Sequence, residues 1–309
     1  SHVHVFSGDG QWISFTYEYH VLAASEKAGA QQNQRNVGVA VPSLGPVSVP
    51  KSHPRNHSGV AFSVIVTTTR DAPVRGSDEI NRAYSDAWVG EDGYIRSDGS
   101  KQERALAFIG DVVDKHGETV SELFIVDLPE DPTVAGEHPL CGTKTTRPAA
   151  PRGVVQRRLT HTTSRKHPGL GAVRHWPRSS PDGKKIAFLM RDDAGNEQLW
   201  TIGPSGEDLQ QLTQNDCAIT SAFSWRSDGR AIACVAGGRV CEVDVSTGVT
   251  TPVTPIRSDA GVPRPEAVVY SPDGSLIAYA RSMDSDSGSF SQVFVAESGL
   301  AAKGSRPSS

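Results

Sequence analysis

No long hydrophobic run occurs in this 309-residue chain. The longest apolar stretch, residues 60–66, is interrupted by a serine and is far shorter than the roughly 20 residues that cross a bilayer. An excess of basic charge is also missing, because 31 Lys and Arg stand against 35 Asp and Glu. The sequence therefore predicts a soluble protein without membrane insertion and without a nucleic-acid partner, and it leaves the cytoplasm and the periplasm open.

Motifs that mark several common enzymes are missing as well. The chain contains no Gly-x-Ser-x-Gly elbow, no phosphate-binding Gly-Lys-Ser/Thr loop and no Gly-x-Gly-x-x-Gly fingerprint, so nothing supports an α/β-hydrolase triad or nucleotide chemistry. Its four cysteines lack the Cys-x-x-Cys spacing of a structural zinc site. Cys234 and Cys241 flank an Ala-Gly-Gly-Arg segment, which predicts a hairpin with the two thiols opposite each other, either as small buried residues or as a disulfide.

What the chain does have is turns, with 30 Gly and 20 Pro, and a repeat that contains them. Four segments share a short strand that enters an Asp-Gly turn: residues 2–10, 175–183, 221–229 and 266–274. The turn residues are Asp9, Asp182, Asp228 and Asp273, of which the last three lie 46 and 45 residues apart. An apolar strand, a polar turn and a further strand follow, and blades close on Leu-Thr or Val-Thr. This period is typical of propeller blades with four antiparallel strands.

The sequence therefore predicts an all-β fold, a β-propeller of four-stranded antiparallel blades over residues 1–297, with five blades visible. One irregular blade should contain strands at 60–67, 105–111, 122–127 and 156–160. Segments 70–103 and 129–153 are rich in Gly, Pro, Ser and charge, so we expect surface insertions there, with a helical turn in which Asp78 pairs with Arg82. Residues 298–309 are small and polar, which favours a disordered tail.

The repeat resembles that of TolB-type, WD40-like propellers, in which Ser-Pro-Asp-Gly is followed by Ile-Ala-Phe and a closing Leu-Thr. A closer resemblance is to a bacterial family of TolB-like propellers of unknown function. It is carried by residues 1–7, 78–84, 105–111, 153–160 and 186–193. Members of that family have further blades before the His-Val-His segment, so the resemblance implies an N-terminally shortened chain. The first residues look like the middle of a strand, which also favours an incomplete ring of six or seven blades.

In a propeller, the strand that enters each Asp-Gly turn lines the central channel, so the repeat defines equivalent channel positions. Seven residues before the turn Asp stand His2, His175, Ser221 and Glu266. His4 lies two residues after His2, and side chains two apart on a strand share a face. Arg174 lies beside this ring. Imidazole and carboxylate groups suit a divalent metal such as manganese, zinc or calcium; alternatively, these residues are hydrogen-bonded pairs of the kind that fill propeller channels without catalysis.

Two classes of function stay open. One is a binding scaffold for a protein or oligosaccharide ligand at the channel mouth, as TolB-type propellers often are. The other follows from a more distant similarity to oligogalacturonate lyases and is a metal-dependent lyase or hydrolase acting on an acidic oligosaccharide. That resemblance implies that a metal held by His2, His175 and Glu266 neutralises the uronate carboxylate. His4 would then remove the adjacent carbon-bound proton, while Arg174 would anchor the carboxylate.

Overall fold

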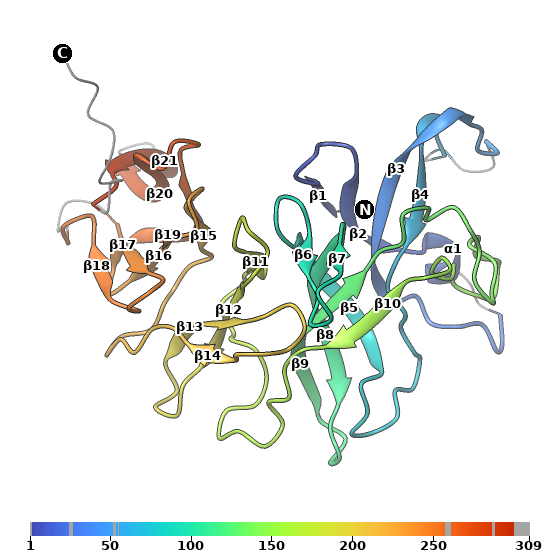
Figure 1. Cartoon of the computed structure of the whole chain (residues 1–309), viewed down its shortest axis with the longest axis horizontal. Helices are drawn as coiled ribbons and strands as arrows, with labels where there is room; N and C mark the ends of the chain where they lie inside the picture. The colour runs from blue at the N-terminus through green and yellow to red at the C-terminus, as the bar shows by residue number, and fades with distance from the viewer. Residues whose placement is uncertain are drawn as a thin grey trace. The chain divides into compact units, whose positions relative to one another are not determined.

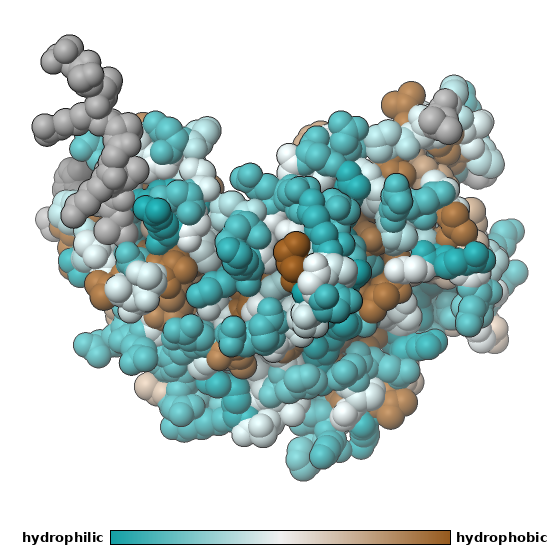
Figure 2. Space-filling model, in the orientation of Figure 1, coloured by the Kyte–Doolittle hydropathy of each residue, from teal (hydrophilic) through white to brown (hydrophobic). Residues whose placement is uncertain are grey.

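The computed structural model of the chain describes residues 2–24, 27–51, 54, 56–256, 261–285 and 288–299. Contacts divide the chain into two compact units. Unit 1 comprises Ser1–Ser164 with Pro204–Gly206, and unit 2 comprises Arg165–Gly203 with Glu207–Ser309. None of the described helices is long and apolar enough to cross a bilayer. On the face drawn in Figure 2, hydrophobic residues lie in small groups among polar ones.

Unit 1 contains two four-stranded antiparallel sheets (Figure 1). The first has the order β1-β2-β3-β4 and consists of β1 (His2–Phe6), β2 (Ile13–Glu18), β3 (Arg35–Val47) and β4 (Gly59–Ile65). The four-residue helix α1 (His20–Ala23) follows β2. The second has the order β10-β9-β8-β5 and consists of β5 (Ile80–Trp88), β8 (Ala105–Val113), β9 (Thr119–Asp127) and β10 (Val155–Arg158). A small hairpin joins β6 (Tyr94–Ile95) to β7 (Lys101–Gln102).

Unit 2 contains three antiparallel sheets. The first consists of β11 (Arg178–Ser179), β12 (Ile186–Arg191), β13 (Glu197–Ile202) and β14 (Gln210–Gln211). The second consists of β15 (Ser224–Trp225), β16 (Ala231–Ala236), β17 (Arg239–Asp244) and β18 (Thr250–Pro252). The third has three strands, β19 (Pro263–Tyr270), β20 (Leu276–Ser285) and β21 (Gly288–Glu297). The predicted all-β fold of propeller blades, five in number, is confirmed.

The Asp-Gly turns are built alike in four blades, as predicted. In each, the Gly after the turn Asp has a positive φ, between 68° and 72°, a conformation that costs other residues energy. The carboxylate accepts the N–H two residues on, at 3.0 Å from Gln11 to Asp9 and at 3.1 Å from Ser275 to Asp273. Serine hydroxyls and then these N–H groups lower the pKa of Asp9 and Asp273 to about 2.

Each four-stranded blade closes with an apolar residue followed by Thr, and this pair binds the third strand. In the β11–β14 blade, Thr213 Oγ1 accepts the Leu199 N–H at 3.0 Å, and the Leu212 N–H donates to the Leu199 carbonyl at 2.8 Å. We call Leu199 the receiver residue of its blade. The other blades repeat both bonds, with receivers Val37, Leu123 and Val240 for the pairs Val66-Thr67, Leu159-Thr160 and Val253-Thr254.

The receiver residues have a second hydrogen-bonding group beside them. The Thr213 hydroxyl donates to Gln198 Oε1 at 2.7 Å. Thr67 donates to Asn36 Oδ1 at 3.1 Å, and Thr160 donates to Glu122. The residue before the receiver therefore supplies a side-chain acceptor for the closing Thr in three blades. These bonds explain why Leu-Thr and Val-Thr recur in the sequence.

Part of the irregular blade was predicted wrongly. Residues 59–65 form β4, which closes the first sheet, rather than opening the second. The opening strand is β5, which lies within the segment predicted as an insertion at 70–103 and begins inside the expected helical turn. Arg82 lies in β5, and Asp78 pairs with Arg158 at 3.3 Å. Two register shifts in β5 break its alternation of apolar and polar residues, and Ser85 adopts a φ of 56°. The other three predicted strands are present as β8, β9 and β10.

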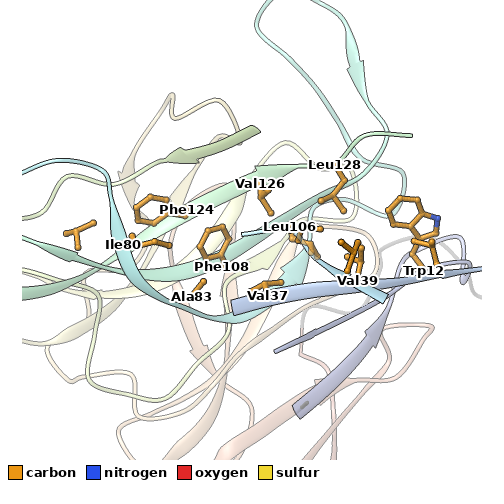
Figure 3. Packing of buried hydrophobic residues seen from close by; sticks show 14 of the residues in the cluster. Trp12, Val37, Val39, Ile80, Ala83, Leu106, Phe108, Phe124, Val126 and Leu128 are labelled. Atoms are coloured by element: carbon orange, nitrogen blue, oxygen red, sulfur yellow. The ribbon is translucent and has the colours of Figure 1, made fainter. Parts of the chain in front are cut away.

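The core of unit 1 fills the space between its own strands (Figure 3). Phe108 on β8 and Phe124 on β9 stack with ring centroids 5.5 Å apart. Ile80 and Ala83 bring β5 into the same cluster, which also includes Trp12, the residue before β2. Burial of these side chains, rather than regular alternation, places β5 in the second sheet.

Two smaller predictions also have outcomes. Cys234 and Cys241 are direct cross-strand partners, as expected, and both are free and buried. Ser298 and Gly299, placed in the disordered tail by the prediction, are instead bound to the carboxylate of Glu242 through the Ser298 hydroxyl at 2.7 Å and the Gly299 N–H at 2.6 Å. Residues 300–309 lie outside the described residues.

Candidate functional site

His175 has a structural role that the repeat register explains. It is buried, 2% exposed. Its Nε2 accepts the Leu189 N–H at 3.2 Å, and its Nδ1 lies 2.8 Å from the Val173 carbonyl. The ring is therefore neutral, with the proton on Nδ1. Burial lowers the pKa of His175 to about 4, since a charged imidazolium is poorly solvated there.

Ser221 confirms that this role belongs to the position. It is the residue equivalent to His175 in the next blade, and its hydroxyl accepts the Val235 N–H at 2.8 Å. Leu189 and Val235 each lie seven residues after their turn Asp. Both side chains thus satisfy the same backbone donor of the second strand. With both ring nitrogens in hydrogen bonds, His175 offers no lone pair to a metal in this conformation.

The other predicted site residues are placed as follows. His2 and His4 lie in β1 of unit 1, and the side chain of His2 lies outside the described part of the chain. The exposed His4 ring is 6.2 Å from the Phe15 ring. In unit 2, the exposed Glu266 pairs with Arg264 at 2.6 Å.

Arg174, also exposed, lies over the Trp176 ring at 5.0 Å. Among the described residues, no group of three or more His, Cys, Asp or Glu side chains could hold a metal ion. The metal-binding role of His2, His175 and Glu266, and the catalytic roles of His4 and Arg174, stay predictions.

A pocket of about 580 Å³ lies elsewhere in unit 1. One wall is the blade side, formed by the end of β4, the three threonines that follow it, Asn36 of β3 and Gln156 of β10. The facing wall is residues 136–151, within the predicted insertion 129–153. Pockets of 300–1,000 Å³ are the usual size for small ligands.

Arg147 fixes the wall formed by the insertion. Its side chain is 9% exposed. Nη1 donates to the Gln32 carbonyl at 2.7 Å and pairs with Asp71, while Nη2 donates to the Thr69 carbonyl at 3.1 Å. The Arg147 N–H donates to Gln31 Oε1 at 2.7 Å. One guanidinium thereby joins segments 76 to 115 residues apart and holds the pocket open as a formed site.

The blade wall is also held in place by side chains. Gln156 accepts the Thr68 N–H at 2.9 Å and donates to the Thr68 carbonyl at 3.3 Å. Asn36, 3% exposed, accepts the Thr67 and Thr69 hydroxyls at 3.1 and 3.4 Å. These bonds join the segment after β4 to β3 and β10 and so fix the position of this wall.

The pocket lining combines apolar carbons with a few charged and titratable groups. Apolar carbons come from Ile65, Val154 and the Pro and Ala residues at 139 and 148–151. Charged or titratable groups are Arg70, Glu137, His138, Arg147 and the free thiol of Cys141. The lining includes one carboxylate and one imidazole, neighbours on an exposed loop, and no Phe, Trp or Tyr side chain. The sequence prediction missed this pocket; the available signals were three consecutive threonines after a closing strand and a Pro-Ala-rich insertion.

Comparisons with known proteins support the fold. Residues 1–57 match a family described as "Protein of unknown function (DUF3748)". Over 283 residues the chain is 48% identical to "Uncharacterized protein YidR" of Escherichia coli (strain K12), covering 90% of this chain. The chain spans 64% of the length of that relative.

This chain is similar to bacterial proteins of unknown function.

Solved structures extend the comparison. A puromycin hydrolase has a TM-score of 0.51 at 14% identity, covering 91% of this chain and 34% of its own. This match shows a shared fold alone. TolB from Acinetobacter baumannii has a TM-score of 0.46 at 15% identity, covering 96% of this chain and 54% of its own. An oligogalacturonate lyase in complex with manganese has a TM-score of 0.43 at 16% identity, covering 94% of this chain and 61% of its own. The predicted resemblance to TolB-like propellers of unknown function, and more distantly to oligogalacturonate lyases, is confirmed.

Proposed function

We propose that the protein is a binding scaffold whose pocket beneath the 136–151 segment holds an extended segment of a partner polypeptide. The observation that carries this proposal is the formed pocket of about 580 Å³, walled by a segment that Arg147 ties to the blade. A pocket already open needs no ordering of its walls on binding, which lowers the entropic cost of association.

The lining matches a peptide better than a sugar. The exposed Thr68 hydroxyl and the side-chain NH2 of Gln31 suit peptide N–H and C=O groups, and the proline and alanine carbons suit apolar side chains. A sugar ring packs its C–H face on an aromatic side chain, and the lining has no Phe, Trp or Tyr. The hydrogen bonds of His175 weigh against the metal-dependent lyase, which needed that ring as a ligand.

Selection of peptides from a random displayed library tests this proposal. The variant Thr68→Trp fills the pocket from an exposed position without touching the backbone bonds between residue 68 and Gln156. The matched control is Thr119→Trp, an exposed threonine at the start of β9 outside the lining. Peptides enriched on the wild type should bind Thr119→Trp equally and Thr68→Trp at least about tenfold more weakly, as measured by fluorescence anisotropy.

Two outcomes would overturn the proposal. The first is that no peptide is enriched, or that enriched peptides bind Thr68→Trp as tightly as the wild type. The second is cleavage of oligogalacturonate by the wild type in the presence of manganese. That result would favour the lyase instead.

A further inference from the structure

Arg281 is a buried cation in the fifth sheet. It lies in β20 opposite Pro263 of β19, and it is 1% exposed. It has the largest side chain among the fully buried residues of the described chain. Nη1 donates to the Gly261 carbonyl at 2.8 Å, whereas Nε and Nη2 have no hydrogen-bond partner. Donors of a charged group are therefore buried here without acceptors.

The guanidinium lies against an apolar interior of unit 2. Its central carbon is 5.4 Å from the centre of the Tyr279 ring, which belongs to the same face of β20 two residues earlier. Tyr279 is part of a hydrophobic cluster with Val235 and Val240 of the β15–β18 sheet. An aromatic face attracts a cation only weakly, and the apolar side chains of the cluster solvate no charge. The packing around Arg281 therefore does not compensate its charge.

Two other buried arginines show how this chain usually compensates such a charge. The Arg158 side chain is 5% exposed and pairs with Glu122 at 2.8 Å. The Arg226 side chain is 7% exposed and pairs with Asp228 at 2.9 Å. Arg281 is more deeply buried than either, yet it forms no ion pair with a carboxylate of the described residues.

The acidic residues nearest to Arg281 along its own sheet do not supply this charge. Glu266, three residues after Pro263 on β19, pairs with Arg264 at 2.6 Å. Asp284, three residues after Arg281 on β20, is exposed, and side chains three apart on a strand point to opposite faces. An arginine in a protein cannot lose its charge by deprotonation, and a buried charge without a counter-charge is strongly destabilising. The negative charge must therefore come from outside the described residues.

The unpartnered atoms form one complete binding edge. In a guanidinium group, the Nε–H bond and one Nη2–H bond are parallel and point in the same direction. This edge can donate two hydrogen bonds to a single anion, while the Nη1 bond to Gly261 holds the group in place. A neutral acceptor such as water would satisfy the donors but would leave the charge uncompensated. Because Arg281 is 1% exposed, the anion must also be small.

We propose that Arg281 is the binding site of a small inorganic anion, with chloride as the physiological example. The Nε–H and Nη2–H groups donate to the anion, and the charge of the anion neutralises the guanidinium. Since the anion binds the folded protein and not the unfolded chain, it stabilises unit 2. The site shares no residue with the pocket proposed for peptides.

Chloride binding is measured from the excess line width of the chlorine NMR signal and from the melting temperature. Sodium chloride replaces sodium gluconate at constant ionic strength, because gluconate is too large for a buried site. We expect the wild type to broaden the chlorine signal and to gain stability as the chloride concentration rises. In crystals of the wild type grown with bromide, an anomalous peak should lie beside Nε and Nη2 of Arg281.

Substitutions of Arg281 locate the site. Arg281→Met puts an unbranched apolar side chain in the same place without the charge, so it should reduce the excess line width at least about tenfold. Its melting temperature should also gain about 2 °C less from chloride than that of the wild type. Arg281→Lys keeps the charge but lacks the two-donor edge, so it should bind chloride more weakly than the wild type.

Arg264→Met is the matched control, because Arg264 lies on the neighbouring strand β19 and its side chain is 39% exposed. This variant should respond to chloride as the wild type does. General effects of the two salts on stability act on every variant alike, so the comparison between variants isolates binding at Arg281.

Three results would overturn the proposal. They are equal chlorine line widths with the wild type and Arg281→Met, an equal response of both melting temperatures to chloride, or bromide crystals with only water beside Arg281. A fourth concerns Asp259, which precedes Gly261 by two residues and lies outside the described residues. If Asp259→Asn lowers the melting temperature of the wild type but not that of Arg281→Met, a carboxylate of the chain supplies the counter-charge instead.

Discussion

In this protein, single side chains accept hydrogen bonds from strand N–H groups that strand pairing does not satisfy. His175 and Ser221 differ in size and chemistry, yet each accepts one second-strand N–H, from Leu189 and Val235 respectively. A buried N–H without an acceptor costs about 1–3 kcal/mol, so the position selects an acceptor rather than a particular residue type. Histidine meets this need only while it is neutral, which couples the stability of this blade to pH.

Stability should therefore fall with acidity through His175. The pKa of His175 is lowered from 6.5 in the unfolded chain to about 4 in the folded one, so the unfolded state binds the proton more tightly. Its contribution is complete above pH 6.5 and is lost as the pH falls toward 4, by about 3 kcal/mol in total. Urea unfolding followed by tryptophan fluorescence between pH 7.5 and 4 should show a weaker pH dependence for His175→Asn than for the wild type.

The comparison between variants isolates this residue from the carboxylates that titrate in the same range. His116, exposed in the turn between β8 and β9, provides the matched control. His116→Asn should follow the wild-type curve. Parallel curves for His175→Asn and the wild type would mean that protonation of His175 does not oppose folding.

At the scale of the element, the closing strand is the unit of construction. β14 and β18 have only two and three residues, too few to hold by strand pairing alone. The closing Thr adds a hydroxyl that both accepts and donates, as Thr213 does between Leu199 and Gln198. A short strand with this one residue completes its blade.

Removing that hydroxyl should open the edge of the blade. Thr213 is 0% exposed, so Thr213→Val keeps the shape but leaves the Leu199 N–H without its acceptor, at a cost of about 1–3 kcal/mol. Gln198 Oε1 loses the Thr213 hydroxyl and keeps the Asn215 N–H at 3.2 Å. Hydrogen exchange should rise at the amides of residues 199 and 212. The control Thr251→Val, on an exposed position of β18, should change neither exchange nor stability beyond about 0.5 kcal/mol. Unchanged exchange in Thr213→Val would show that strand pairing suffices.

Across the whole molecule, features set by local chemistry were predictable and features set by distant contacts were not. The Asp-Gly turns could be predicted, because Gly is needed for the positive φ after Asp182 and its equivalents. β5 could not be predicted from the sequence, because bulges interrupt its alternation of apolar and polar residues. Only the burial of Ile80 explains its position in the second sheet. The pocket depends on Arg147 meeting residues up to 116 positions away, which no local pattern encodes. His175 was recognised as equivalent to Ser221, but its hydrogen bonds depend on a neighbouring strand.

Each unit has its own hydrophobic clusters. A cavity made in one cluster should therefore destabilise mainly the unit that contains it. Phe108 and Phe124 belong to a cluster made of unit 1 residues alone, and Leu199 to one made of unit 2 residues alone. Leu199→Ala removes a fully buried side chain and should destabilise unit 2 by about 2–5 kcal/mol. Hydrogen exchange measured by mass spectrometry should rise over residues 186–202 and 231–243 and stay at the wild-type level over 105–127.

Leu209→Ala makes the same substitution at a side chain that is 46% exposed, and it should leave exchange unchanged in both units. Equal acceleration over 105–127 and 186–202 in Leu199→Ala would instead mean that the chain opens as one cooperative body. In that case a cavity in one cluster would lower the protection of every core amide by the same factor, because all of them would exchange through the same global unfolding.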